Sequence, residues 1–191
     1  MADAPLAYLI TFRCYGTWLH GDERGSIDRR HNQYGGDYIP DNRRWRSYNS
    51  RALKHAPVRL SPEQRKCVEY AIRETCLFRN WDLHAVNVRT NHAHSLITAY
   101  VVPNEMSVPF AVANGLAEGL PPERILNALK ANATRQMRQD GHWPHPHTPW
   151  ADGGSRRYIW TEFQLEQARE YVISGQDGPI PEFDKRKRGV R

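Results

Sequence analysis

Apolar residues recur at every second position in several segments, which is the period of a β-strand. The clearest case is residues 6–15, where tyrosine, isoleucine, phenylalanine and cysteine occupy alternate positions. Residues 81–90 and 92–101 are predicted as a second and a third strand, which a tight turn joins into an antiparallel hairpin. Residues 155–160 form a predicted short fourth strand.

Three segments show the signals of amphipathic helices. Residues 61–64 provide a serine N-cap, a proline at the first helical position and a glutamine placed for a capping box. Apolar residues with helical spacing follow over residues 68–76, and this helix should end near Phe78. A second helix is predicted from residue 121 to about residue 140, and a third over residues 161–175.

Polar segments separate these elements. Residues 20–57 are rich in Gly, Asn, Asp and Arg and nearly lack aliphatic residues, so we expect a long loop or insertion there. Its arginines and aromatic residues either form a single-stranded nucleic acid surface or belong to a solvated excursion whose rings cover the edge of the core. Residues 102–120 are a predicted connector, and residues 142–154 hold too many prolines and glycines for regular structure.

The predicted order is strand, helix, strand, strand, helix, strand, which is the ferredoxin-like βαββαβ plan. We therefore expect an α+β fold with a four-stranded antiparallel sheet, two helices on one face and a further C-terminal helix. In this plan the first and third strands lie side by side at the centre of the sheet. Residues 1–180 should form one domain that includes the polar insertion, and residues 181–191 a basic tail.

The composition narrows the class of protein. Hydrophobic residues make up 39% of the 191 positions and the mean hydropathy is −0.76, so a few segments must supply the core. The net charge of +6 suits a polyanionic partner without requiring one. Three cysteines without CxxC spacing argue against a disulfide framework and fit a reducing cytoplasm. No apolar run reaches the length of a membrane span.

Two histidine pairs are candidates for metal binding. His92 and His94 lie in the predicted third strand, where residues two apart project from the same face, so their imidazoles can share one divalent ion. His145 and His147 have the same spacing, but they flank a proline in an irregular segment with no strand to align them. We therefore expect the first pair to form the metal site and the second to be loop residues.

The predicted last helix carries Tyr171, and Gln176 and Asp177 follow it after a glycine. A tyrosine phenol is a poor nucleophile unless it is polarised. Beside a divalent ion bound to a scissile phosphate, however, it can attack phosphorus and form a phosphotyrosine link. The alternative is an ordinary interfacial tyrosine on an amphipathic helix, and the residue pattern alone favours that alternative.

These motifs, taken in order, resemble those of one known family. Residues 91–97 (NHAHSLI) are similar to the histidine–hydrophobic–histidine (HUH) motif of single-tyrosine transposases, which include small insertion-sequence and REP-associated tyrosine transposases. Residues 156–160, a capped helix and residues 170–173 resemble the tyrosine-bearing segment of that family. Residues 15–19 and 21–25 look like a subgroup of such proteins. The resemblance extends from the first strand to the last helix in matching order.

The family uses a ferredoxin-like fold to cut and rejoin single-stranded DNA, usually beside a hairpin, through a 5′-phosphotyrosine and a free 3′-OH, with Mg²⁺ or Mn²⁺. The resemblance implies that Tyr171 is the nucleophile and that His92 and His94 are metal ligands. It also points to Gln176 as the third ligand, because a glutamine after the tyrosine helix commonly completes the set. The usual spacing from tyrosine to glutamine is four residues, whereas here it is five, so Asp177 is the alternative.

We therefore expect a DNA-nicking and strand-transferring transposase that acts on hairpin-containing single-stranded DNA. A homodimer is expected, and the tyrosine helix could serve its own subunit or a partner. Two alternatives stay open: a non-catalytic nucleic-acid-binding module with structural histidines, and a metal-dependent phosphoesterase that uses water. The basic residues expected to contact DNA are Arg13, Lys130, Arg135, Arg138, Arg156 and Arg157.

Overall fold

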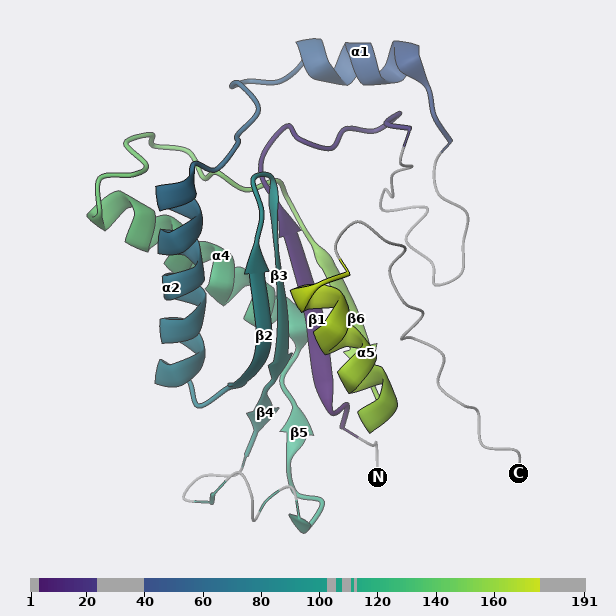
Figure 1. Ribbon diagram of the computed structural model, residues 1–191, viewed down its shortest axis with the longest axis vertical. Helices are drawn as coiled ribbons and strands as arrows, with labels where there is room; N and C mark the ends of the chain where they lie inside the picture. Colours follow the sequence, from purple (N-terminus) through teal and green to yellow (C-terminus); the bar gives the residue numbers. More distant parts are fainter. Residues whose placement is uncertain (1–3, 24–39, 103–105, 108–110, 112, 176–191) are drawn as a thin grey trace.

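A computed structural model describes residues 4–23, 40–102, 106–107, 111 and 113–175 (Figure 1). Four strands form an antiparallel sheet in the order β2–β3–β1–β6. Their bounds are β1 Ala7–Arg13, β2 Asp82–Val88, β3 His92–Thr98 and β6 Ser155–Ile159. The central strands β1 and β3 pair with each other, as predicted, and the fold is ferredoxin-like βαββαβ.

Helices α2 (Pro62–Phe78) and α4 (Pro122–Gln139) cover one face of the sheet (Figure 1). The predicted capping box begins α2, since Ser61 Oγ accepts from Gln64 N and Gln64 Oε1 accepts from Ser61 N. Tyr8, Ile10 and Phe12 of β1 point towards these helices and belong to the larger of two apolar cores. The alternation predicted for the first strand therefore points to this core.

Helix α5 (Glu162–Ile173) packs against the opposite face, over β2 and β3 (Figure 1). Thr161 Oγ1 accepts from Gln164 N at its start, as the sequence indicated. A smaller core lies between α5 and the sheet. Its buried members are Ala7, Leu9, Ala85, Leu96, Ile159, Ala168, Tyr171 and Val172. Since Leu96 points to α5, the two-residue period of β3 directs His92 and His94 to the same face.

The prediction of a long loop over residues 20–57 was wrong for residues 43–51, which form helix α1 (Arg43–Arg51). Asn42 caps this helix by accepting from Trp45 N at 3.0 Å. None of the residues of α1 is buried, and its sequence, RRWRSYNSR, contains no aliphatic residue. The sequence therefore lacks the aliphatic stripe by which the other helices were predicted. The predicted third strand also ends early, at Thr98; β4 (Tyr100–Val101) and β5 (Glu118–Gly119) form a separate two-stranded ribbon.

The second histidine pair lies in irregular structure, as predicted, after Gly141 ends α4 with a φ of +74°. There His147 stacks on His55, with ring centroids 3.8 Å apart, and on His145 at 5.1 Å. No helix in the described residues is long and apolar enough to cross a membrane. The predicted basic tail, 181–191, lies outside the described residues.

Candidate active site

The two histidines of β3 stand side by side on the face covered by α5. Their ring centroids are 4.6 Å apart and their planes meet at 82°. The sheet register surrounds them with polar residues, because Arg13 of β1 pairs with His92, whereas Thr11 of β1 and Asn87 of β2 both pair with His94. The pair therefore occupies two central positions of the sheet, where the backbone is bonded on both sides.

Hydrogen bonds to the protein engage the same nitrogen in both rings. His92 Nδ1 lies 2.7 Å from Asn91 Oδ1, and because a carbonyl oxygen only accepts, this nitrogen carries the proton. His94 Nδ1 lies 2.7 Å from Thr11 Oγ1. In both rings Nε2 is therefore the nitrogen that could bind an ion. The hydrogen bond at Nδ1 would orient the ring, as it does in known metal sites. The donor set fits a divalent cation.

Burial keeps His94 neutral. Its side chain is 3% exposed, and this burial lowers the pKa of the imidazole to about 3; the positive charges of His92, Arg13 and Arg89 act in the same direction. A neutral imidazole is the form that binds a metal ion, because protonation would occupy the lone pair. At neutral pH, His94 therefore needs to release no proton before it can act as a ligand.

Tyr171 lies beside this pair, on α5 of the same chain. Its ring centroid is 5.5 Å from that of His94, with the planes at 80°, and its side chain is only 7% exposed. Burial raises the pKa of the phenol above its ordinary value, while Arg157 of β6 acts in the opposite direction. Arg157 pairs with Leu9 of β1, so it projects from the same face of the sheet. The phenol is therefore protonated at neutral pH and would have to lose its proton to act as a nucleophile.

Two residues set the position of the end of α5 relative to the sheet. Asn87 Nδ2 donates to Val172 O at 2.9 Å, and this carbonyl is one of those at a helix C-terminus that lack an intrahelical partner. Gly175 packs closely on the tyrosine: a Cβ at this position would lie 3.0 Å from Tyr171 Cα and 3.3 Å from its ring atom Cδ2. Both contacts fix where the phenol stands.

Asn91 appeared only as the first residue of the histidine motif, and the sequence did not single out Thr11 or Asn87 as part of the site. The only available signal was their polarity at strand positions, and the register that brings Thr11 and Asn87 to His94 is a long-range property. Gln176 and Asp177 lie outside the described residues. Among the residues described, no group of three or more His, Cys, Asp or Glu could hold a metal ion, so in that part of the chain the histidine pair has no such third ligand.

Two of the arginines expected to contact DNA lie on the tyrosine side of the sheet. Arg13 is paired with His92 in the strand register, and its guanidinium carbon lies 3.4 Å from the centroid of the Trp18 ring. Arg157 is close enough to Tyr171 to influence its pKa. Both are partly exposed, and their contact with DNA stays a prediction.

The other four lie on the face covered by α2 and α4, and three of them bond to the protein. Arg156 pairs with Glu123 at 2.9 Å, and Lys130 Nζ donates to Ala151 O at 2.6 Å. Arg138 donates to carbonyl groups of the 145–147 loop, while Arg135 is exposed on α4. The fold thus separates these residues from Tyr171, and their role in DNA binding stays a prediction.

The fold of this chain is similar to those of solved structures. No protein-family model and no curated protein matches the chain. One similar structure is a REP-associated tyrosine transposase bound to a REP hairpin, with a TM-score of 0.45 and 12% identity over 89% of this chain and 66% of that one. Another is a candidate transposase from Deinococcus radiodurans R1, with a TM-score of 0.40 and 15% identity over 93% of this chain and 95% of that one. This chain thus spans just under two thirds of the first.

Proposed function

We propose that this protein is a single-tyrosine transposase that cuts and rejoins single-stranded DNA next to a hairpin. The observation that carries the proposal is the meeting of Tyr171 with His94 and His92 on one face of the sheet. These residues come from distant parts of the chain and are the ones that the resemblance to HUH transposases named. The ring of Tyr171 contacts that of His94, which in turn contacts that of His92.

In the proposed cleavage step, Tyr171 Oη bonds to the phosphorus of the scissile phosphodiester while the P–O3′ bond breaks. The phenol proton leaves to solvent, and the 3′ oxygen takes up a proton to become the free 3′-OH. In the rejoining step a 3′-OH attacks the phosphotyrosine phosphorus, and Tyr171 departs and regains its proton. No net bond energy is lost between the two steps, so the protein can join strands without a cofactor that supplies energy.

His92 and His94 would hold a divalent ion, Mg²⁺ or Mn²⁺, through Nε2, and Gln176 or Asp177 would be a further ligand. When bound, the ion would neutralise phosphate charge and orient the displacement. Arg157 favours loss of the phenol proton, because a cation near Tyr171 stabilises the phenolate. Arg13 stands beside His92 and can pair with a neighbouring phosphate. The chain's own residues thus position both the nucleophile and its target.

A covalent adduct tests the nucleophile. Wild-type protein incubated with Mn²⁺ and hairpin-containing single-stranded DNA should form a protein–DNA adduct that survives denaturing electrophoresis. Tyr171→Phe should form none and still bind the DNA, whereas Tyr70→Phe, an exposed tyrosine on α2, should behave as wild type. Cleavage without any adduct would instead favour a water-using phosphoesterase. Binding without cleavage in the wild type would favour a non-catalytic module.

The metal assignment has a separate test. His92→Ala should abolish cleavage and weaken Mn²⁺ binding in calorimetry, because the remaining His94 cannot hold the ion alone. His145→Ala, which removes a loop histidine of the second pair, provides the matched control. If His92→Ala keeps both cleavage and its dependence on Mn²⁺, the histidine pair is not the metal site.

A further inference from the structure

Helix α1 has a defined place in the fold although none of its residues is buried. Asn42 N donates to Gly21 O at 3.2 Å, and Asn49 Nδ2 donates to His20 O, also at 3.2 Å. The ring of Trp45 stacks on that of His20, with centroids 5.3 Å apart. A nine-residue helix is marginal in water by itself, so these polar and stacking contacts with residues 20–22 stabilise it.

The contact at Gly21 is close. Gly21 has a φ of +87°, and a Cβ there would lie 2.5 Å from Asn42 O, which only glycine avoids. Next to it, Arg46 stands 3.9 Å from the carboxylate of the buried Asp22. The chain therefore docks α1 in one orientation and does not leave it as a free excursion.

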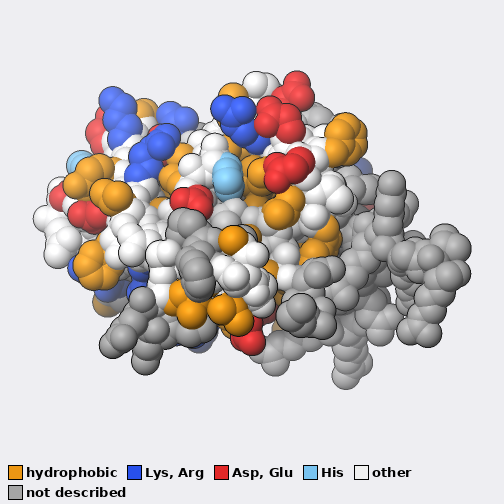
Figure 2. All heavy atoms as spheres, turned by 90° about the horizontal axis from the view of Figure 1, so that it is seen from below, with side chains coloured by type: hydrophobic (Ala, Val, Ile, Leu, Met, Phe, Trp, Pro, Cys, Tyr) orange, Lys and Arg blue, Asp and Glu red, His pale blue; other side chains and the backbone are white. Residues whose placement is uncertain are grey.

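The residues of α1 itself carry positive charge only. Its nine residues, RRWRSYNSR, include four arginines and no acidic residue. Two of them, Arg43 and Arg44, occupy the first turn, where the helix dipole disfavours cations. By contrast, the lower end of the molecule carries acidic and basic side chains interleaved (Figure 2). A concentrated positive charge on a docked helix becomes favourable when a polyanion lies against it.

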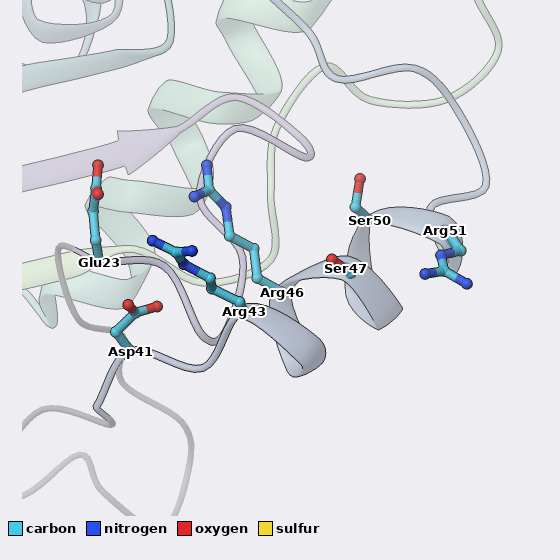
Figure 3. A pocket seen from close by; sticks show the side chains of 7 residues that line it. All are labelled: Glu23, Asp41, Arg43, Arg46, Ser47, Ser50 and Arg51. Atoms are coloured by element: carbon cyan, nitrogen blue, oxygen red, sulfur yellow. The ribbon is translucent and has the colours of Figure 1, made fainter.

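One stripe of α1 lines a hollow of about 600 Å³. The stripe consists of residues at positions i, i+3, i+4, i+7 and i+8, namely Arg43, Arg46, Ser47, Ser50 and Arg51. Guanidinium and hydroxyl groups are hydrogen-bond donors suited to phosphate oxygens. Glu23 and Asp41 complete the lining near Arg43, where α1 begins, while Arg51 lies at the other end of the helix (Figure 3).

We propose that this stripe of α1 is a binding track for the sugar-phosphate backbone of the DNA that the active site cuts. Identifying the polyanion as DNA rests on the proposed function. Within the described part of the chain, Arg43 and Arg51 make no ion pair, and both are exposed. From Arg43 to Arg51 the helix rises about 12 Å, over which one strand of B-form DNA presents three or four phosphates.

The position of α1 suits this role. It stands beyond the turn between β2 and β3, at the end of the sheet where His92 begins β3 (Figure 1). The backbone that leads to it, residues 14–18, also runs past this end, since Cys14 N donates to Asn91 O at 2.8 Å. DNA bound with its scissile phosphate at Tyr171 can therefore extend along the sheet towards α1.

The salt dependence of binding tests the track. We would measure the affinity of Tyr171→Phe protein, which cannot cut, for a labelled unpaired oligonucleotide and for a blunt hairpin, at several salt concentrations. In this background Arg43→Gln/Arg51→Gln should reduce the slope of log K against log salt by about 1.4 on a single strand or about 1.8 on a duplex, since each phosphate contact contributes about 0.7 or 0.9. Affinity at low salt should fall roughly tenfold or more.

Matched controls separate this from a general loss of charge or of folding. Arg73→Gln/Arg124→Gln removes two exposed arginines from α2 and α4 and should leave the slope near its original value. Ser47→Ala/Ser50→Ala keeps the charge and should weaken binding to a smaller extent. A loss confined to the hairpin assigns the track to stem phosphates, and a loss confined to the unpaired strand assigns it to the flanking strand. If the slope of Arg43→Gln/Arg51→Gln equals that of the Arg73→Gln/Arg124→Gln control on both the hairpin and the unpaired strand, the proposal is overturned.

The two proposals can fail separately. If the wild type forms no tyrosine adduct but the Arg43/Arg51 pair still sets the salt slope, the proposed cleavage is wrong and the track stands. If the adduct forms and the slope is unchanged, the cleavage stands and the track is wrong.

Discussion

A hydrogen bond between His94 Nδ1 and Thr11 Oγ1 on the neighbouring strand holds the His94 ring in one orientation. The bond turns Nε2 towards the site and determines which nitrogen could accept an ion. His92 depends in the same way on Asn91, its neighbour in the chain. At the scale of single residues, each histidine has a hydrogen-bond partner, and one of them, Thr11, lies outside the histidine motif.

Removal of the threonine hydroxyl should therefore weaken metal binding without unfolding the protein. Thr11→Val preserves the shape of the side chain but removes the bond to His94, and we expect Mn²⁺ affinity to fall roughly ten- to one-hundredfold, as for other second hydrogen bonds in metal sites. Calorimetric titration with Mn²⁺ measures this. Thr75→Val, which removes a buried hydroxyl bonded to Ala71 O on α2, is the control. Unchanged affinity in Thr11→Val would mean that the hydroxyl does not orient His94.

The lowered pKa of His94 predicts how stability depends on pH in the metal-free protein. The folded pKa of about 3 lies below the ordinary value of 6.5, so below pH 6.5 the unfolded chain binds a proton that the folded chain does not. The free energy of unfolding should thus fall as the pH falls, by up to about 1.4 kcal/mol per pH unit from this group. Urea unfolding in EDTA between pH 7 and 4 measures the slope. His94→Gln should flatten it by that amount; an unchanged slope would contradict the assignment.

At the scale of elements, α5 is attached to the sheet by a small core and by one side chain at its C-terminal end. Asn87 on β2 faces His94 in the register and also bonds to the backbone of α5, so one residue links the histidine pair to the tyrosine helix. The helix is otherwise held by Ala168, Val172 and the ring of Tyr171 itself. The proposed nucleophile, Tyr171, is therefore part of the packing that positions it.

Asn87→Ala should separate the chemistry from metal binding. Loss of the bond to Val172 O frees the end of α5, so the rate of adduct formation should fall while Mn²⁺ affinity changes little. The free energy of unfolding should fall by about 1 kcal/mol, the usual net value of one hydrogen bond. Single-turnover adduct assays measure the rate, and Asn127→Ala on the exposed side of α4 is the control. An unchanged rate would mean that Asn87 has no part in placing Tyr171.

At the scale of the whole molecule, the sheet divides two cores of unequal size. The larger one lies between the sheet and helices α2 and α4, whereas the smaller one lies under α5. The proposed catalytic groups are on the side of the smaller core. Most of the stability thus comes from one face of the sheet, and the proposed chemistry takes place on the other.

Equivalent truncations in the two cores should consequently have different effects. Leu129→Ala on α4 should lower the free energy of unfolding of the entire domain by about 2–5 kcal/mol. Val172→Ala on α5 should mainly reduce the protection of the α5 amides, because local opening of that helix leaves the larger core intact. Hydrogen exchange followed by mass spectrometry distinguishes the two. Equal loss of protection across the chain in both variants would contradict this division.

Local signals were sufficient where structure depends on neighbours in the chain. The capping box at Ser61, the end of α4 at Gly141 and the two-residue period that puts His92 and His94 on one face all depend on residues a few positions apart. The strand order followed from the βαββαβ succession of elements, which matches the ferredoxin-like plan. Helix α1 escaped prediction because its sequence carries no aliphatic stripe. Contacts with residues 20–22, which are distant in the sequence, stabilise it instead.

By itself, the sequence determined the βαββαβ order of the main elements, the shared face of the two histidines and the presence of a tyrosine on the last helix. Only the tertiary structure decided that this helix packs on the histidine face of its own sheet, with the rings of Tyr171 and His94 5.5 Å apart. It also decided that Thr11 and Asn87 flank His94, and that Lys130 and Arg156 bond to the protein on the far face. The physical reason is that periodicity assigns a residue to a face, whereas register and packing between distant segments decide what it meets there.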